Sequence, residues 1–65
     1  MKIVVNGAET ELAAPDLEGA LVELGYAEAR VATALNESFV PATARSDVRL
    51  EPGDRLEIVA PRQGG

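Results

Sequence analysis

The segment KIVVNGAETEL, residues 2–12, determines how the fold begins. Residues 3–5 are all β-branched, which favours a strand, and the run is apolar on both faces, as expected inside a sheet rather than at its edge. Asn6 and Gly7 form the pair preferred in a two-residue type I′ turn, because both residue types tolerate a positive φ. Residues 8–12 then alternate acidic side chains with Thr and Leu. The segment therefore predicts an N-terminal β-hairpin.

The next segment, residues 16–25, has the apolar period of an amphipathic helix. Its apolar side chains recur at i, i+3, i+4 and i+7: Leu17, Ala20, Leu21 and Leu24. Asp16 suits the start, where an acidic group complements the helix dipole, and Gly25 supplies the left-handed residue that ends the helix. A helix of under about 12 residues is marginal alone, so this one has to be held by packing on the sheet. The expected sheet partners of its leucines are Ile3, Val5, Leu35, Leu56 and Ile58.

A second strand pair is predicted in the middle of the chain. Residues 30–35 (RVATAL) are apolar or small on both faces, as in a central strand. Asn36 and Glu37 then turn the chain into a short strand, residues 38–40, which Pro41 ends because proline cannot donate to a ladder.

The last strand follows an irregular stretch and the turn EPGD, residues 51–54, where Pro and Gly stand as a type II turn requires. Residues 55–60 then alternate in character. Leu56, Ile58 and Ala60 are expected on the buried face, with charged side chains opposite.

These elements together predict an α+β fold with one mixed sheet of four to five strands crossed by one main helix. If the first and last strands pair in parallel at the centre, this is the ubiquitin-like β-grasp arrangement, in which the helix covers one face of the sheet. The expected organisation is a β-grasp domain over residues 1–60, followed by a flexible Gly-Gly tail over residues 61–65.

Composition excludes several classes of function. The chain of 65 residues contains no Cys and no His, which removes disulfides, thiolate nucleophiles and the commonest general base. A net charge of −5 disfavours binding to nucleic acid and to anionic membranes. No leader pattern follows Met1, and no apolar run approaches the roughly 20 residues of a membrane span. We therefore expect a cytoplasmic protein with no metal site and no side-chain catalysis.

The tail PRQGG, residues 61–65, is the remaining candidate for chemistry. Its five residues, fully extended, reach at most about 16–18 Å, which is long enough to enter another protein's active site. Without a Cβ, Gly64 passes through a channel too narrow for other residues. The predicted reactive group is the carboxylate of Gly65, and Gly64 and Gln63 are expected to be required for entry.

Several motifs, in this order and spacing, resemble the ThiS family of sulfur carriers in thiamin biosynthesis. They are Asn6-Gly7, residues 31–36 (VATALN), Phe39-Val40-Pro41, residues 52–59 (PGDRLEIV) and Gln63-Gly64-Gly65. The resemblance runs from end to end and implies the ubiquitin-like β-grasp fold. One departure is at Ala42 and Arg45, where many members carry a basic residue and then an aromatic one.

The resemblance also implies a mechanism. An E1-like adenylating enzyme, using ATP and magnesium, would activate the carboxylate of Gly65, and sulfur from a cysteine desulfurase-derived donor would convert it to a thiocarboxylate for thiazole synthase. The chain itself would then be a co-substrate rather than an enzyme, with no catalytic residue and no bound cofactor. Its candidate partner face is the sheet face that the helix leaves open, with Val4, Phe39 and Val59.

Three alternatives remain open from the sequence. The small subunit of molybdopterin synthase has the same fold and a Gly-Gly end but serves another pathway. A regulatory β-grasp binding module needs no terminal glycines. A stand-alone enzyme with paired carboxylates is conceivable with 11 acidic residues, although nothing in their spacing suggests one.

Overall fold

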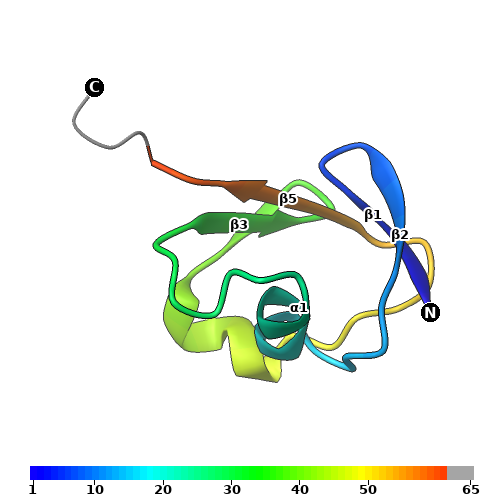
Figure 1. Cartoon of the computed structure of the whole chain (residues 1–65), viewed down its shortest axis with the longest axis horizontal. Helices are drawn as coiled ribbons and strands as arrows, with labels where there is room; N and C mark the ends of the chain where they lie inside the picture. The colour runs from blue at the N-terminus through cyan, green and yellow to red at the C-terminus, as the bar shows by residue number, and fades with distance from the viewer. Residues whose placement is uncertain (62–65) are drawn as a thin grey trace.

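The first and last strands lie side by side and parallel at the centre of one sheet. In the computed structural model, which describes residues 1–61, β1 (Lys2–Val5) pairs with β5 (Arg55–Val59) so that Val4 lies opposite Arg55 and Val5 opposite Leu56. The strand order is β2-β1-β5-β3-β4, and within the described part of the chain a single α-helix crosses one face (Figure 1). This confirms the predicted mixed sheet and the parallel central pair that defines a β-grasp.

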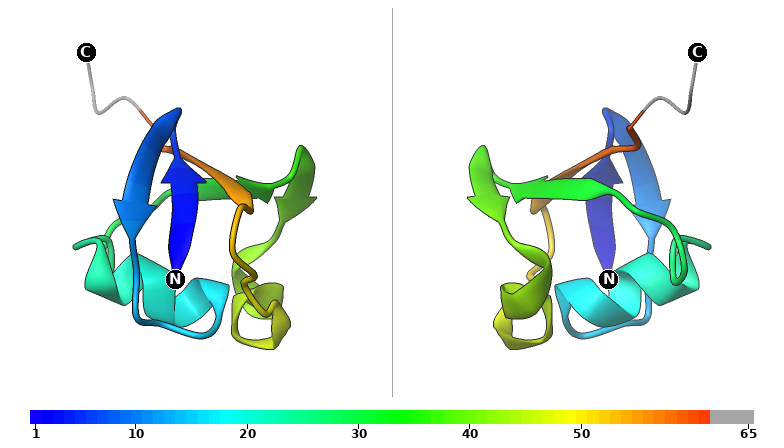
Figure 2. Two further views of the ribbon diagram at one scale, coloured as in Figure 1. Left: turned by 90° about the vertical axis from the view of Figure 1, so that its right-hand side faces the viewer. Right: turned by 90° about the vertical axis from the view of Figure 1, so that its left-hand side faces the viewer.

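The other elements follow the order expected from the sequence. They are β2 (Ala8–Glu11), α1 (Leu17–Glu23), β3 (Ala32–Leu35), β4 (Ser38–Val40) and a 3-10 helix, η1 (Ala42–Asp47). The stretch expected to be irregular thus contains η1, which packs beside α1 on the same side of the sheet (Figure 2). Among residues 1–61, no helix covers the other side. No helix among residues 1–61 has the length and apolar character of a membrane span.

Both hairpin turns place two residues in the left-handed region. Asn6 has φ 50° and Gly7 has φ 85°, which confirms the predicted turn between β1 and β2. The turn between β3 and β4 repeats this with Asn36 at 51° and Glu37 at 73°. Glu37 therefore occupies a conformation that favours glycine, at a cost in backbone strain.

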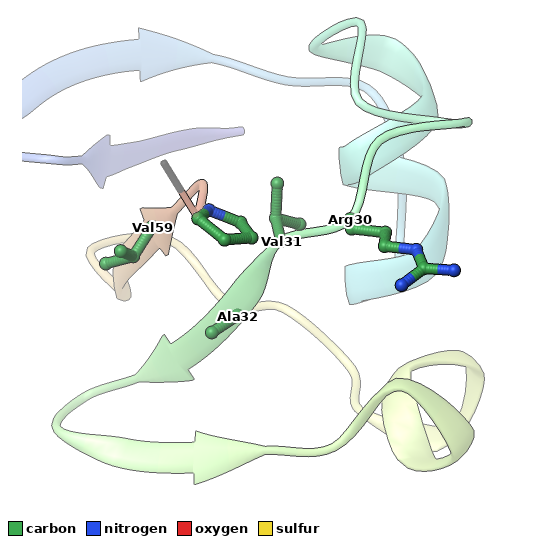
Figure 3. Close-up of a pocket in the computed structure, with 5 residues that line it drawn as sticks. Arg30, Val31, Ala32 and Val59 are labelled. Carbon is green, nitrogen blue, oxygen red and sulfur yellow. The ribbon is translucent and has the colours of Figure 1, made fainter. Parts of the chain in front are cut away.

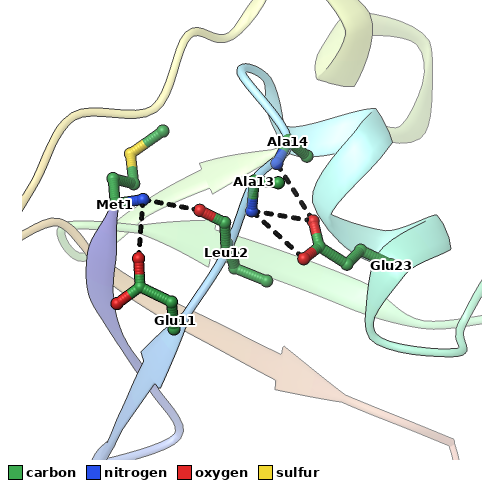
Figure 4. A network of polar contacts seen from close by, with 6 residues as sticks. All are labelled: Met1, Glu11, Leu12, Ala13, Ala14 and Glu23. Atoms are coloured by element: carbon green, nitrogen blue, oxygen red, sulfur yellow. Dashed lines mark hydrogen bonds and ion pairs between the residues drawn. The ribbon is translucent and has the colours of Figure 1, made fainter.

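A side-chain cap and a glycine mark the two ends of α1. The Asp16 carboxylate accepts a hydrogen bond from the Gly19 N–H at 2.7 Å, and Gly25 follows the helix with φ 92°, so both predicted ends are confirmed. The Glu23 carboxylate accepts from the N–H groups of Ala13 and Ala14 at 3.1 and 3.0 Å, which ties the loop before α1 to the helix (Figure 4).

A second set of polar contacts holds the end of the β1–β2 pair next to Met1. The Met1 amino group donates to the Leu12 carbonyl at 2.6 Å and lies 3.0 Å from a Glu11 carboxylate oxygen (Figure 4). It thereby continues the pairing of β1 and β2 by one residue.

The core lies between α1 and the sheet, as the two periodicities predicted. Its buried apolar residues are Ile3, Leu12, Leu17, Ala20, Leu21, Val40, Leu50, Leu56 and Ile58. Three of the residues expected there, Val5, Leu24 and Leu35, are half-buried at its margin. Sequence periodicity therefore identified the centre of the core, and the structure adds Leu12, Val40 and Leu50 from segments outside that pattern.

The structure corrects two strand ends. Ladder pairing between β3 and β5 ends with Ala32 opposite Val59, so residues 30–31 precede the strand that was expected to start at residue 30. Ala60, expected on the buried face, is exposed beyond the end of β5. The physical reason is shared, because neither end has a partner strand to continue the ladder.

Candidate functional site

The residues of the predicted tail site come shortly after β5 in the sequence. Gln63, Gly64 and Gly65 lie outside the described residues 1–61, so the predictions about them remain predictions. The structure does show the approach to them, because β5 ends at Val59, and Ala60 and Pro61 follow it as exposed residues (Figure 1).

Side-chain clusters offer no competing site in the described part of the chain. Over residues 1–61, no three acidic side chains come together in a way that could hold a metal ion. The ion pairs seen there are Met1 with Glu11 and Arg55 with Glu37, both at the protein surface. The described residues that precede the predicted tail site are those around the end of β5.

The sheet face opposite α1, here called the open face, carries all three candidate partner residues. The alternate residues of β3 and β5, such as Thr33, Leu56 and Ile58, are buried on the helix side, so Val59 and its neighbours at every second position point to the open face. Phe39 is 70% exposed and Val59 is 64% exposed.

The open face is divided into an apolar and a charged part. Phe39 lies opposite Ala34, and Val59 lies opposite Ala32, so apolar side chains occupy this face of β3, β4 and the end of β5, interrupted on β5 by the exposed Glu57 opposite Ala34. Val4 is half-buried, with Glu9 opposite it on one side and Arg55 on the other. The structure thus places Phe39 and Val59 in the apolar part and separates Val4 from them.

A shallow hollow lies where β5 ends. Its volume is about 310 Å³, and its lining is almost wholly apolar: Arg30, Val31, Ala32, Val59 and Pro61 (Figure 3). The hollow, named here the junction hollow, joins the start of β3 to the last described residue of the chain. Of its lining residues, the sequence indicated only Val59 as a candidate partner residue. The others could not be grouped with it from the sequence, because the antiparallel pairing of β3 with β5 is what brings residues 30–32 beside residues 59–61.

Arg45 holds one wall of the junction hollow in place. Its Nη2 donates to the Val31 carbonyl at 2.7 Å, and its Nε donates to the Thr33 hydroxyl at 3.2 Å. The hydroxyl of the buried Thr33 in turn donates to the Val40 carbonyl at 2.8 Å, which extends the hydrogen-bond chain to β4. The arginine at the position where the sequence departs from the family pattern therefore binds its own chain, joining η1 to β3 and β4.

Comparison with known proteins assigns this architecture. The sequence matches the ThiS family over residues 3–65. The structure is similar to the crystal structure of a thiamine biosynthesis protein (ThiS) from Geobacter metallireducens, with a TM-score of 0.80, 28% sequence identity and full coverage of both chains.

A second similarity is to part of a longer protein. The chain is 41% identical over 66 residues to a thiazole synthase of Paramagnetospirillum magneticum, a match that covers 100% of this chain and 20% of that protein. The chain thus spans about a fifth of the length of this relative.

Proposed function

The chain belongs to the ThiS family of ubiquitin-like sulfur carriers in thiamin biosynthesis, and we propose that it carries sulfur as a thiocarboxylate on Gly65. The observation that carries this proposal is the family match, which extends through residue 65 and so includes the Gly64-Gly65 pair. The full-length structural similarity to a ThiS protein supports it.

The proposed chemistry begins with activation of a poor electrophile. A carboxylate oxygen of Gly65 attacks the α-phosphate of ATP in the active site of an E1-like adenylating enzyme, and pyrophosphate leaves. The acyl adenylate now has AMP as a good leaving group. The terminal sulfur of a persulfide, supplied by a cysteine desulfurase-derived donor, attacks the carbonyl carbon and displaces AMP. A thiol then cleaves the sulfur–sulfur bond, forming a disulfide and leaving the thiocarboxylate on Gly65.

The partner enzyme, rather than this chain, has to supply the active site. Water would hydrolyse an acyl adenylate, so the reaction needs a closed active site in the partner. ATP and magnesium therefore belong to that enzyme. This chain supplies recognition and a narrow backbone, with Gln63 and Gly64 in the entry channel, and we place the reaction in the cytoplasm, where ATP is available to the partner.

Thiazole synthase is the proposed recipient of the sulfur. The relative from Paramagnetospirillum magneticum, a protein of that name, contains a segment 41% identical to this chain. A carrier-like segment within a thiazole synthase is what one expects if the two proteins act together, because a covalent link raises their effective concentration. The thiocarboxylate sulfur, as a soft nucleophile, would be delivered there to build the thiazole ring.

The proposed partner face is the apolar part of the open face, with Phe39 and Val59. Both side chains are mostly exposed in the free chain. Aromatic residues such as Phe39 are enriched in the cores of protein interfaces, and burial of Val59 would remove further apolar surface from water. Val4 lies in the charged part and is half-buried, so it contributes less apolar area than the other two residues.

Mass spectrometry of the intact protein tests the proposal. Incubation of the purified protein with the adenylating enzyme, ATP, magnesium and a sulfur donor should raise its intact mass by the difference of one oxygen-to-sulfur exchange. Release of pyrophosphate should depend on the carrier. A variant lacking Gly65 should give neither signal, whereas the exposed-surface variant Glu51→Gln should give both. Sulfur loading of the variant without Gly65 would disprove the assignment.

A further inference from the structure

We propose that the junction hollow receives the rim of the active-site entrance of thiazole synthase, and that this rim presents one apolar side chain flanked by a carboxylate that pairs with Arg30. The inference rests on the proposed function and adds the chemistry of the partner surface. It assigns to Arg30 a role in recognising the partner.

Chain length places the partner at the hollow. Gly65 follows Pro61 by four residues, and four residues span at most about 13–14 Å even when fully extended. Any active site that accepts Gly65 therefore lies within that distance of Pro61, and the surface around its entrance has to contact the surface around Pro61. Pro61 itself lines the hollow, together with Val59 and Val31.

The shape and lining of the hollow indicate an apolar occupant. Val59 is 64% exposed in the free chain and Val31 is half-buried, so a side chain seated between them would remove apolar surface from water. The hydrogen bond from Arg45 to the Val31 carbonyl fixes one wall before the partner arrives. A wall that is already ordered loses less conformational entropy on binding.

Arg30 supplies the charge at the border of the hollow. Its backbone lies beside Val31, and its guanidinium points away from Val59, so the positive charge flanks the apolar space without filling it (Figure 3). Within residues 1–61 it forms no ion pair. A carboxylate next to the inserted side chain would complete the contact, since guanidinium and carboxylate groups pair through two parallel hydrogen bonds.

This local charge distinguishes the hollow from the molecule as a whole. The chain has a net charge of −5, which by itself would favour a basic partner surface. A partner that was basic throughout would be repelled by Arg30 at the point of closest approach. The expected partner surface is therefore acidic and apolar where it meets the junction hollow.

Calorimetric titration against the thiazole synthase of the same organism tests the inference. Arg30→Glu should weaken binding by at least about tenfold, because it sets two carboxylates against each other, and Arg30→Lys should keep most of the affinity. Val59→Ser should weaken binding several-fold. The loss caused by Arg30→Glu should shrink as salt is raised.

Two matched controls separate the site from general effects of charge and polarity. Arg49→Glu makes the same charge change at an exposed residue beside the start of α1, and Val22→Ser makes the same polarity change at a side chain on α1 that is 56% exposed. Both should bind as the wild type does. Equal losses in the controls, or wild-type affinity in Arg30→Glu and Val59→Ser, would overturn the inference.

The outcome also distinguishes this inference from the proposed function. If the wild-type chain gains sulfur on Gly65 and binds thiazole synthase, but the hollow variants bind normally, only the inference is wrong. If the wild-type chain does not bind thiazole synthase, the proposed recipient is wrong and the inference falls with it.

Discussion

The side-chain amide of Asn6 makes two hydrogen bonds with the backbone of Ile58, 52 positions further along the chain. Its Oδ1 accepts from the Ile58 N–H at 2.8 Å, and its Nδ2 donates to the Ile58 carbonyl at 3.2 Å. The turn that follows β1 is thereby attached to β5 just before Val59. The point where the chain leaves the sheet towards Gly65 is fixed by a residue near its beginning.

Asn6→Gly should lower the free energy of unfolding by about 1–3 kcal/mol, because it keeps the positive φ and leaves partly buried backbone groups of Ile58 without partners. Urea unfolding measures this. Asn36→Gly is the matched control, since Asn36 also accepts from a β5 N–H, that of Arg55, but at an exposed position where water can replace it. Its loss should be smaller, and equal losses would contradict the role given to Asn6.

Leu21→Ala should cost about 2–5 kcal/mol, since it leaves a cavity between α1 and the sheet. Leu21 is only 3% exposed, whereas the adjacent Val22 is 56% exposed. Val22→Ala should therefore stay within about 0.5 kcal/mol of the wild type in the same denaturant titration. A loss below about 0.5 kcal/mol for Leu21→Ala would place this side chain outside the core.

Glu37→Gly should raise the free energy of unfolding by about 0.5–1 kcal/mol, because glycine relieves the backbone strain at φ 73°. Part of this gain is offset, since glycine also increases the conformational entropy of the unfolded chain. The substitution also removes the ion pair with Arg55, 3.5 Å long and exposed, which contributes little. Glu37→Gln removes the charge but keeps the strain, so thermal unfolding should show almost no change. If Glu37→Gly is no more stable than Glu37→Gln, backbone strain at this turn is not significant.

Gly64→Val should impair sulfur loading of Gly65 without lowering thermal stability. A β-branched side chain cannot share a channel shaped for bare backbone, and residue 64 follows the end of the last strand by several residues. Pyrophosphate release and intact mass measure loading, and a melting curve measures stability. Gly64→Ala should be intermediate. Full loading of the valine variant would show that the partner's channel does not require glycine at this position.

Local features of the sequence predicted most of the elements. The Asn6-Gly7 turn, the helix between Asp16 and Gly25 and the alternation through Leu56 and Ile58 were all recognisable, because turn chemistry, capping and side-chain period each act over a few residues. The sequence also predicted the Gly65 carboxylate as the reactive group. That prediction rests on composition and on the resemblance to a family. The end-to-end similarity to a ThiS protein bears out the family, and the role of Gly65 stays a prediction.

The tertiary structure decided which of these local features meet. Val4 and Val59 share the open face by alternation, yet β-sheet register puts Val4 among charged side chains and Val59 beside alanine. The junction hollow forms because β3 runs antiparallel to β5. Their pairing ends with Ala32 opposite Val59, which brings residues 30–32 beside Val59 and Pro61. Register and strand order depend on contacts between segments far apart in the chain, such as Asn6 with Ile58, and no short-range pattern encodes those contacts.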